Sequence, residues 1–227
     1  MEMLLERSSE LEQLGRRLAA VRETGRGHVL LVAGEAGVGK TSLLRAFETS
    51  AGVRSLWGAC DPLFAPRPLG PFVELSRTAS TELRAAVEGE AMAWEVVTAL
   101  EADLRRDAPA IVVIDDLHWA DEATLDVLRL LARRPEQVPA LVLATYRDDE
   151  LSLGHPLRLV LGELATNRDV SRLAVPRLSP EAVAELAAPH AVDADELYRR
   201  TEGNPFFVVE ALDACNDGIP ETIRDAV

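Results

Sequence analysis

The chain of 227 residues, 48% of them hydrophobic, can bury a proper core and suffices for one large domain or for one and a half. Its formal net charge of −14 argues against a general nucleic-acid binder, because neutralising phosphates needs clustered Lys and Arg. Cys60 and Cys215 do not have metal-ligand spacing, so we expect both to be free thiols. No segment approaches the ~18 consecutive apolar residues of a membrane span, so we expect a cytoplasmic protein with no membrane partner.

The first predicted elements are a helix, a strand and a second helix. Apolar side chains recur on one helical face over residues 9–23, and Ser9 with Glu12 fits a capping box at the start of that helix. The apolar run HVLLVA, His28 to Ala33, predicts a buried strand. Helical spacing of the apolar residues after Lys40 then predicts a helix that starts near this lysine.

The eight residues between that strand and that helix read GEAGVGKT, Gly34 to Thr41, and match G-x-x-x-x-G-K-[ST]. Glycines let the backbone approach a polyphosphate, on which successive N–H groups and the positive end of the helix converge. Lys40 is predicted to reach the β- and γ-phosphates, and the Thr41 hydroxyl to ligate Mg²⁺. The predicted nucleotide-contacting residues of this phosphate loop are Gly34, Glu35, Ala36, Gly37, Val38, Gly39, Lys40, Thr41 and Ser42.

The next stretch leads from a second strand into helices. VRSLWGAC, Val53 to Cys60, predicts a strand, and the proline-rich stretch from Asp61 to Phe72 predicts an irregular loop. Residues 73–106 have a helical pattern with a break near Gly89.

Three further strands are predicted in the second half of the chain. They run from Ala110 to Asp116, from Ala140 to Arg147 and, more weakly, from Val170 to Val175, and a helix over 121–134 separates the first two. Apolar strands that alternate with helices predict an α/β fold, a three-layer P-loop NTPase with a parallel five-stranded sheet. After Ser179 the pattern predicts short helices, so we divide the chain into a nucleotide-binding domain, 1–178, and a partial helical lid, 179–215.

Two carboxylates close the third strand, at the edge where open α/β sheets bind ligands. Asp115 is predicted to hold Mg²⁺, as a Walker-B Asp does. Asp116 is predicted to orient or deprotonate the attacking water, and the alternative is that it caps the following turn. Because the side chain of Asp is one methylene shorter than that of Glu, Asp116 reaches the attacking water less well, and we therefore expect slow hydrolysis. His118 either tunes this site or is structural. No N-K-x-D motif is present, which favours adenine over guanine.

Arginines at two strand or helix ends are further candidates. Arg147 ends the fourth strand and is predicted to contact the γ-phosphate, the alternative being a surface ion pair with Asp148 or Asp149. Arg133 and Arg134 end a helix, where cations favour the helix dipole, and the alternative is an arginine finger that acts in trans.

The string IDDLHWADEATLDVL, with GEAGVGKT before it and TYRDDEL and EGNPFFV after it, resembles STAND-class ATPases, which are signal-transducing relatives of AAA+ proteins. The closest resemblance is to the ATPase domain of large LuxR-type bacterial transcriptional regulators. It implies adenine contacts from Arg7, within LLERSSEL, and from Pro205, within Gly203-Asn204-Pro205. LLERSSEL departs from the family pattern, with Glu6 where Gly is usual and Ser8 where Glu is usual.

The same resemblance implies that 216–227 is the start of a winged helix and that DNA binds only through a helix-turn-helix absent from this chain. It also implies a switch, in which ADP locks the lid, ATP releases it and permits self-association, and slow ATP hydrolysis resets the state. Two other functions stay open. One is a constitutively cycling AAA+-type ATPase, and the other is a nucleotide-binding scaffold that does not hydrolyse ATP.

Overall fold

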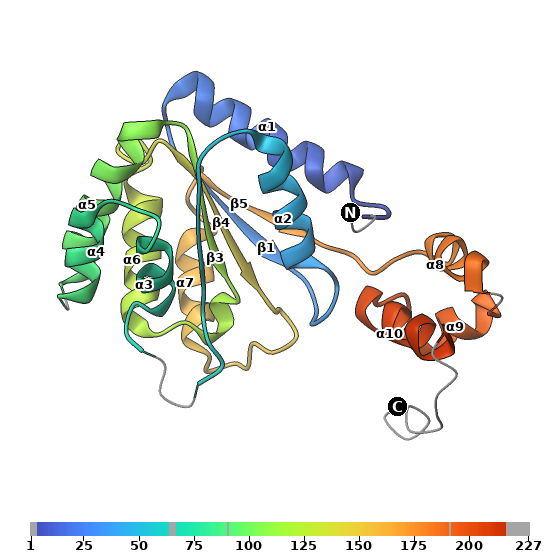
Figure 1. Ribbon diagram of the computed structural model, residues 1–227. Helices are drawn as coiled ribbons and strands as arrows, with labels where there is room; N and C mark the ends of the chain where they lie inside the picture. The colour runs from blue at the N-terminus through green and yellow to red at the C-terminus, as the bar shows by residue number, and fades with distance from the viewer. Residues whose placement is uncertain (1–3, 64–66, 90, 191, 217–227) are drawn as a thin grey trace.

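The computed structural model describes residues 4–63, 67–89, 91–190 and 192–216. Five parallel strands form one sheet in the order β2-β3-β4-β1-β5 (Figure 1). The strands are β1 His28–Ala33, β2 Ser55–Ala59, β3 Ala110–Asp115, β4 Ala140–Tyr146 and β5 Val170–Ala174. The predicted α/β class and parallel five-stranded sheet are therefore confirmed. All five strands were predicted, but β2 is shorter than Val53 to Cys60, and β3, β4 and β5 each end one residue earlier than expected.

Helices cover both faces of the sheet (Figure 1). On one face lie α1 Ser8–Thr24 and α2 Lys40–Ala51, and on the other lie α3 Gly70–Ser76, α4 Thr81–Glu88, α5 Ala93–Leu104, α6 Glu122–Arg133 and α7 Pro156–Leu164. The inner strand β3, between β2 and β4, shows why the strands read as continuous apolar runs. Ile111 and Val113 pack toward α1 and α2, whereas Val112 and Ile114 pack toward the opposite helices.

The lid has a hydrophobic core of its own. It consists of α8 Pro180–Ala187, α9 Ala194–Thr201 and α10 Pro205–Asn216, and it lies beside the sheet domain (Figure 1). Leucines and valines from all three helices meet in this core. Left-handed backbone at Glu202 and Gly203 separates α9 from α10, so the last helical stretch is two helices. The predicted start of a further domain at 216–227 lies almost wholly outside the described residues.

The predicted capping box at the N-terminus is wrong. α1 begins at Ser8 with Arg7 as its N-cap residue, so Ser9 already lies in the first turn. Its hydroxyl bonds the Glu10 carboxylate at 2.9 Å, and Glu12 pairs with Arg16 one turn on.

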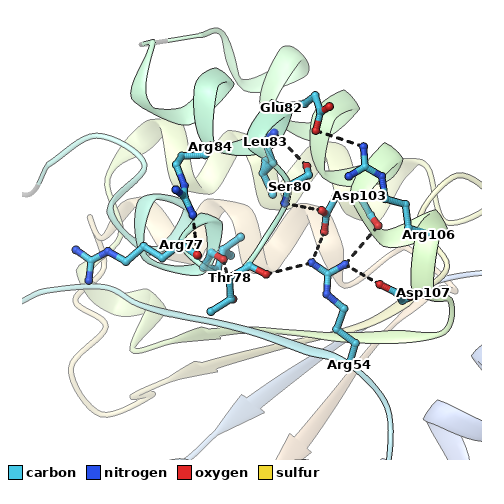
Figure 2. A network of polar contacts seen from close by, with 11 residues as sticks. Arg54, Arg77, Thr78, Ser80, Glu82, Leu83, Arg84, Asp103, Arg106 and Asp107 are labelled. Atoms are coloured by element: carbon cyan, nitrogen blue, oxygen red, sulfur yellow. Dashed lines mark hydrogen bonds and ion pairs between the residues drawn. The ribbon is translucent and has the colours of Figure 1, made fainter.

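The proline-rich loop was predicted to extend too far. α3 starts at Gly70, with Pro71 in its first turn, where a missing N–H costs no hydrogen bond. A second break, which we did not predict, falls before Ser80, whose hydroxyl caps α4 by accepting a bond from the Leu83 N–H. Ser80 also donates its own N–H to Asp103 at 2.8 Å, and Arg54 pairs with the same carboxylate (Figure 2).

Two further outcomes concern α7 and the thiols. The helix α7 was not predicted, although Pro156 at its start and leucines at helical spacing after it are a recognisable pattern. Cys60 and Cys215 are both free, as expected, and Cys60 is buried. Of the helices in the described ranges, none is long and apolar enough to cross a membrane.

Candidate functional site

The phosphate loop connects β1 to α2 at the carboxyl edge of the sheet. Lys40 is 6% exposed, and its ammonium group donates 2.8 Å hydrogen bonds to the carbonyl oxygens of Gly34 and Glu35. Burial lowers the pKa of Lys40, while the nearby Asp116 carboxylate acts in the opposite direction. The N-cap residue of α2 is Gly39, which has no side chain to bond the first N–H groups of the helix, so the loop has the charge and donors that a polyphosphate needs.

Two glycines of the loop are required for different reasons. A side chain at Gly39 would meet open space, although its positive φ of 93° still favours glycine. At Gly37, by contrast, a Cβ would come within 2.7 Å of Phe206 and 2.9 Å of the Asn204 amide oxygen. The absent side chain of Gly37 therefore makes room for the lid, a reason that the loop motif does not reveal.

Asp115 lies 6% exposed between two hydroxyl groups. Thr41 Oγ1 donates to its Oδ2 at 2.8 Å, and Thr145 Oγ1 donates to its Oδ1 at 2.5 Å. A hydroxyl and a carboxylate at this separation suit Mg²⁺, which takes few protein ligands and fills its shell with water and phosphate oxygens. Within the described ranges, no group of three or more His, Cys, Asp or Glu side chains could hold a metal by itself.

Asp116 leaves the strand in a left-handed conformation, with φ 55° and ψ 47°. Its N–H donates to Thr145 Oγ1 at 2.8 Å, and its side chain makes no capping bond to the turn that follows. The carboxyl group instead lines the cavity next to the phosphate loop. Burial and the neighbouring Asp115 raise the pKa of Asp116, which makes it a stronger base once ionised.

Arg147, directly after β4, lines the same cavity. Its guanidinium group pairs with Glu150 and lies 4.9 Å from the centre of the Trp119 ring. The ion-pair partner of Arg147 is thus Glu150 rather than the expected Asp148 or Asp149.

A cavity of about 330 Å³ unites most of the predicted site residues. Its walls come from the phosphate loop, the ends of β3 and β4, and the lid helix α10. The lining residues are Gly37, Gly39, Lys40, Thr41, Ser42, Asp116, Arg147, Pro205, Phe206, Val209 and Glu210. Gly34, Glu35 and Val38 line a second cavity, of about 350 Å³, beside the end of β5.

Arg7 lines neither of these two cavities. It is 2% exposed, and its guanidinium group donates to the carbonyl oxygens of Val38 and Pro176, at 3.3 and 2.8 Å. The neighbouring Glu6 carboxylate accepts bonds from the N–H and the hydroxyl of Ser179, which lower its pKa. Both residues therefore tie the N-terminal segment to the connection between the two domains.

The lid contacts the phosphate loop through residues that the sequence reasoning missed. The Asn204 amide nitrogen donates to the Ala36 carbonyl at 2.8 Å, and the Phe206 N–H donates to the Gly37 carbonyl at 3.2 Å. Arg177 forms ion pairs with Glu35 of the loop and with Glu202 of the lid. Of these lid residues, only Asn204 belongs to the Gly203-Asn204-Pro205 motif, of which it is the middle residue.

The remaining candidates are a histidine and an arginine pair. His118 is 4% exposed and neutral, since burial lowers its pKa to about 4, and its Nε2 lies 3.5 Å from the Glu150 carboxylate. Arg133 is the last residue of α6 and Arg134 is its C-cap, shortly before β4 begins, so both lie at the amino edge of the sheet, away from the phosphate loop.

These features define a P-loop nucleotide-binding domain. Residues 3–143 also match the family described as AAA ATPase domain, and since this is more than half of the chain, the protein belongs to that family. An uncharacterized protein of Rhizobium meliloti (strain 1021) is 29% identical in an alignment that is 276 residues long. The alignment covers 97% of this chain and 26% of that protein. The chain thus spans about a quarter of the length of that relative.

Solved structures share the fold at low identity. The Aeropyrum pernix ORC1 protein, solved in complex with DNA, has a TM-score of 0.65 and 19% identity over 96% of this chain and 61% of its own. The Thermotoga maritima RuvB Holliday junction branch migration motor has a TM-score of 0.52 and 18% identity over 92% of this chain and 62% of its own. The family implies nucleotide binding, usually with Mg²⁺, and ATP hydrolysis.

Proposed function

We propose that this AAA-type ATPase domain is a regulatory switch that binds ATP, hydrolyses it slowly and retains ADP in its resting state. The observation that carries the proposal is the direct hydrogen bonding of the lid to the phosphate loop, from Asn204 to Ala36 and from Phe206 to Gly37. If the phosphate loop takes a different conformation with ATP than with ADP, these hydrogen bonds will change. The same contacts would pass that change on to the position of the lid.

Each predicted site residue has a role in this proposal. Lys40 binds the β- and γ-phosphates, and Asp116 orients or deprotonates the attacking water. Thr41 and Asp115 would hold Mg²⁺, which supplies positive charge to the phosphate oxygens when it is bound. Arg147 contacts the γ-phosphate and so distinguishes ATP from ADP.

The magnitudes suffice for a switch. Moving an equilibrium from 1:99 to 99:1 takes about 5.5 kcal/mol of differential binding. Two or three charge-assisted hydrogen bonds to a γ-phosphate, each roughly 1.5–3 kcal/mol, can supply it, and Lys40 and Arg147 are the donors.

Pro205 contacts the adenine in this proposal, which its position in the lining of the cavity next to the loop supports. Arg7 would act on the base only indirectly, since its guanidinium group is already bonded to Val38 and Pro176. We propose further that the domain works inside a larger cytoplasmic transcriptional regulator, which would self-associate in the ATP state and bind DNA through another domain.

Arg147→Ala tests the proposal. We expect it to leave ADP affinity nearly intact and to abolish the preference for ATP, as measured by calorimetric titration with ADP and with the non-hydrolysable analogue β,γ-imido-ATP. Arg129→Ala, which removes an arginine distant from the cavity, should change neither affinity. Equal losses for both nucleotides in Arg147→Ala would overturn the switch. A cycling ATPase would instead show steady turnover that rises steeply with protein concentration.

A further inference from the structure

Arg147, which lines the cavity, already has a carboxylate partner. Its guanidinium group pairs with Glu150, three residues on, while the Trp119 ring lies below it. The Arg147 side chain is 24% exposed and that of Glu150 is 40% exposed, so water screens the pair only in part. A phosphate that binds Arg147 from the cavity must compete with this carboxylate.

Lys40 offers a contrast within the same cavity. Its ammonium group is held by the neutral carbonyl oxygens of Gly34 and Glu35, and within the described residues it donates no hydrogen bond to a carboxylate. Replacing neutral oxygens by phosphate oxygens gains charge–charge attraction, whereas replacing the Glu150 carboxylate exchanges one anion for another. Glu150 therefore weakens the response of Arg147 to phosphate and leaves that of Lys40 unaffected.

A second partner for the displaced carboxylate lies nearby. His118 is 4% exposed, and within the described residues neither of its ring nitrogens makes a hydrogen bond. Its Nε2 is 3.5 Å from Glu150 Oε2, slightly too far for a good bond. A small movement of Glu150 away from Arg147 would let the neutral imidazole donate an Nε2–H bond to the carboxylate.

We propose that Glu150 is a specificity-determining positioning residue, a counter-ion that competes with the terminal phosphate of ATP for Arg147 and passes to His118 when ATP binds. This inference rests on the role of Arg147 in the proposed function. Glu150 itself touches no phosphate. It reduces the preference for ATP over ADP, and so sets the nucleotide ratio at which the switch responds.

The test is a double-mutant cycle on the full chain with Mg²⁺, ADP and β,γ-imido-ATP, read by calorimetric titration. Glu150→Gln keeps the size of the side chain and removes its charge. We expect it to raise affinity for the triphosphate analogue about two- to fivefold relative to ADP, the range of a partly exposed ion pair. In the Arg147→Ala background the same substitution should have no effect. Glu163→Gln, which breaks the distant pair with Arg129, is the matched control.

Two outcomes would overturn the inference. No gain from Glu150→Gln would mean that the pair does not compete with phosphate. An equal gain with and without Arg147 would mean that Glu150 acts through its general field and not through that arginine. Both differ from a failure of the proposed function, which appears in Arg147→Ala alone as equal losses of the two nucleotides.

Discussion

The two edges of the sheet each bury an aspartate, and they satisfy it differently. At the amino edge Asp103 is 1% exposed and is paired with Arg54 at 2.8 Å (Figure 2). At the carboxyl edge Asp115 is 6% exposed, and among the described residues its carboxylate receives only the hydroxyl bonds of Thr41 and Thr145. The first carboxylate has its cation built into the fold. The second has hydrogen bonds but, in the part of the chain that the structure describes, no ion pair, which is the arrangement expected of a residue that binds a metal ion from solution.

The comparison separates stabilising polar groups from ligand-binding ones. The Asp103 cluster joins β2 to α4 and α5, and the Asp103 carboxylate takes up the Ser80 N–H and the Arg54 guanidinium group (Figure 2). The carboxyl edge instead leaves Lys40 and Arg147 facing a cavity. Substitutions at the amino edge should therefore reduce stability, and those at the carboxyl edge should reduce binding.

The largest expected effect is on stability, at the amino edge. Arg54→Ala leaves Asp103 buried without its cation, and removing one partner of such a pair costs about 3 kcal/mol. Denaturant unfolding should show this loss, while the folded fraction still binds nucleotide normally. Arg129→Ala is the control, because its pairs with Asp126 and Glu163 are more exposed and should contribute about 1 kcal/mol or less. Equal losses in the two variants would show that the Asp103 pair is an ordinary surface contact.

At the carboxyl edge, Asp115→Asn should show the opposite pattern. The amide oxygen still accepts one hydroxyl bond, so we expect a change in unfolding free energy below about 1 kcal/mol. The lost charge should remove the effect of Mg²⁺ on ATP affinity, about tenfold, because charge-assisted contacts contribute about 1.5 kcal/mol or more. Titrations with and without EDTA measure this difference. A loss of stability as large as that of Arg54→Ala would mean that Asp115 is mainly structural.

The sequence predicted the carboxyl edge better than the amino edge. GEAGVGKT and the Asp115–Asp116 pair are local patterns that follow buried strands, so their placement needs only the rule that parallel strands end at one edge. The contact of Arg54 with Asp103 joins residues 49 positions apart, and that of Asn204 with Ala36 joins residues 168 positions apart. No local pattern encodes such pairs. The helix α7 is different, since Pro156 and the leucines after it form a local pattern that does indicate a helix.

The smallest expected effect concerns two asparagines with the same pattern of hydrogen bonds at opposite edges. Asn204 donates to the Ala36 carbonyl and accepts the Phe206 N–H, while Asn167 donates to the Ala132 carbonyl and accepts the Asp169 N–H. Each Ala substitution should cost about 1 kcal/mol, but in different places. Asn204→Ala should weaken the attachment of the lid to the phosphate loop.

Hydrogen exchange separates the two variants. In Asn204→Ala the amides of α10 should exchange about fivefold faster, the equivalent of about 1 kcal/mol, and bound ADP should leave sooner, because the lid has lost a bond to the phosphate loop. Asn167→Ala should lower the unfolding free energy of the sheet domain and leave α10 exchange and ADP release unchanged. If ADP release is the same in both variants, the lid does not sense the loop through Asn204, and the ion pairs of Arg177 with Glu35 and Glu202 become the connection to test.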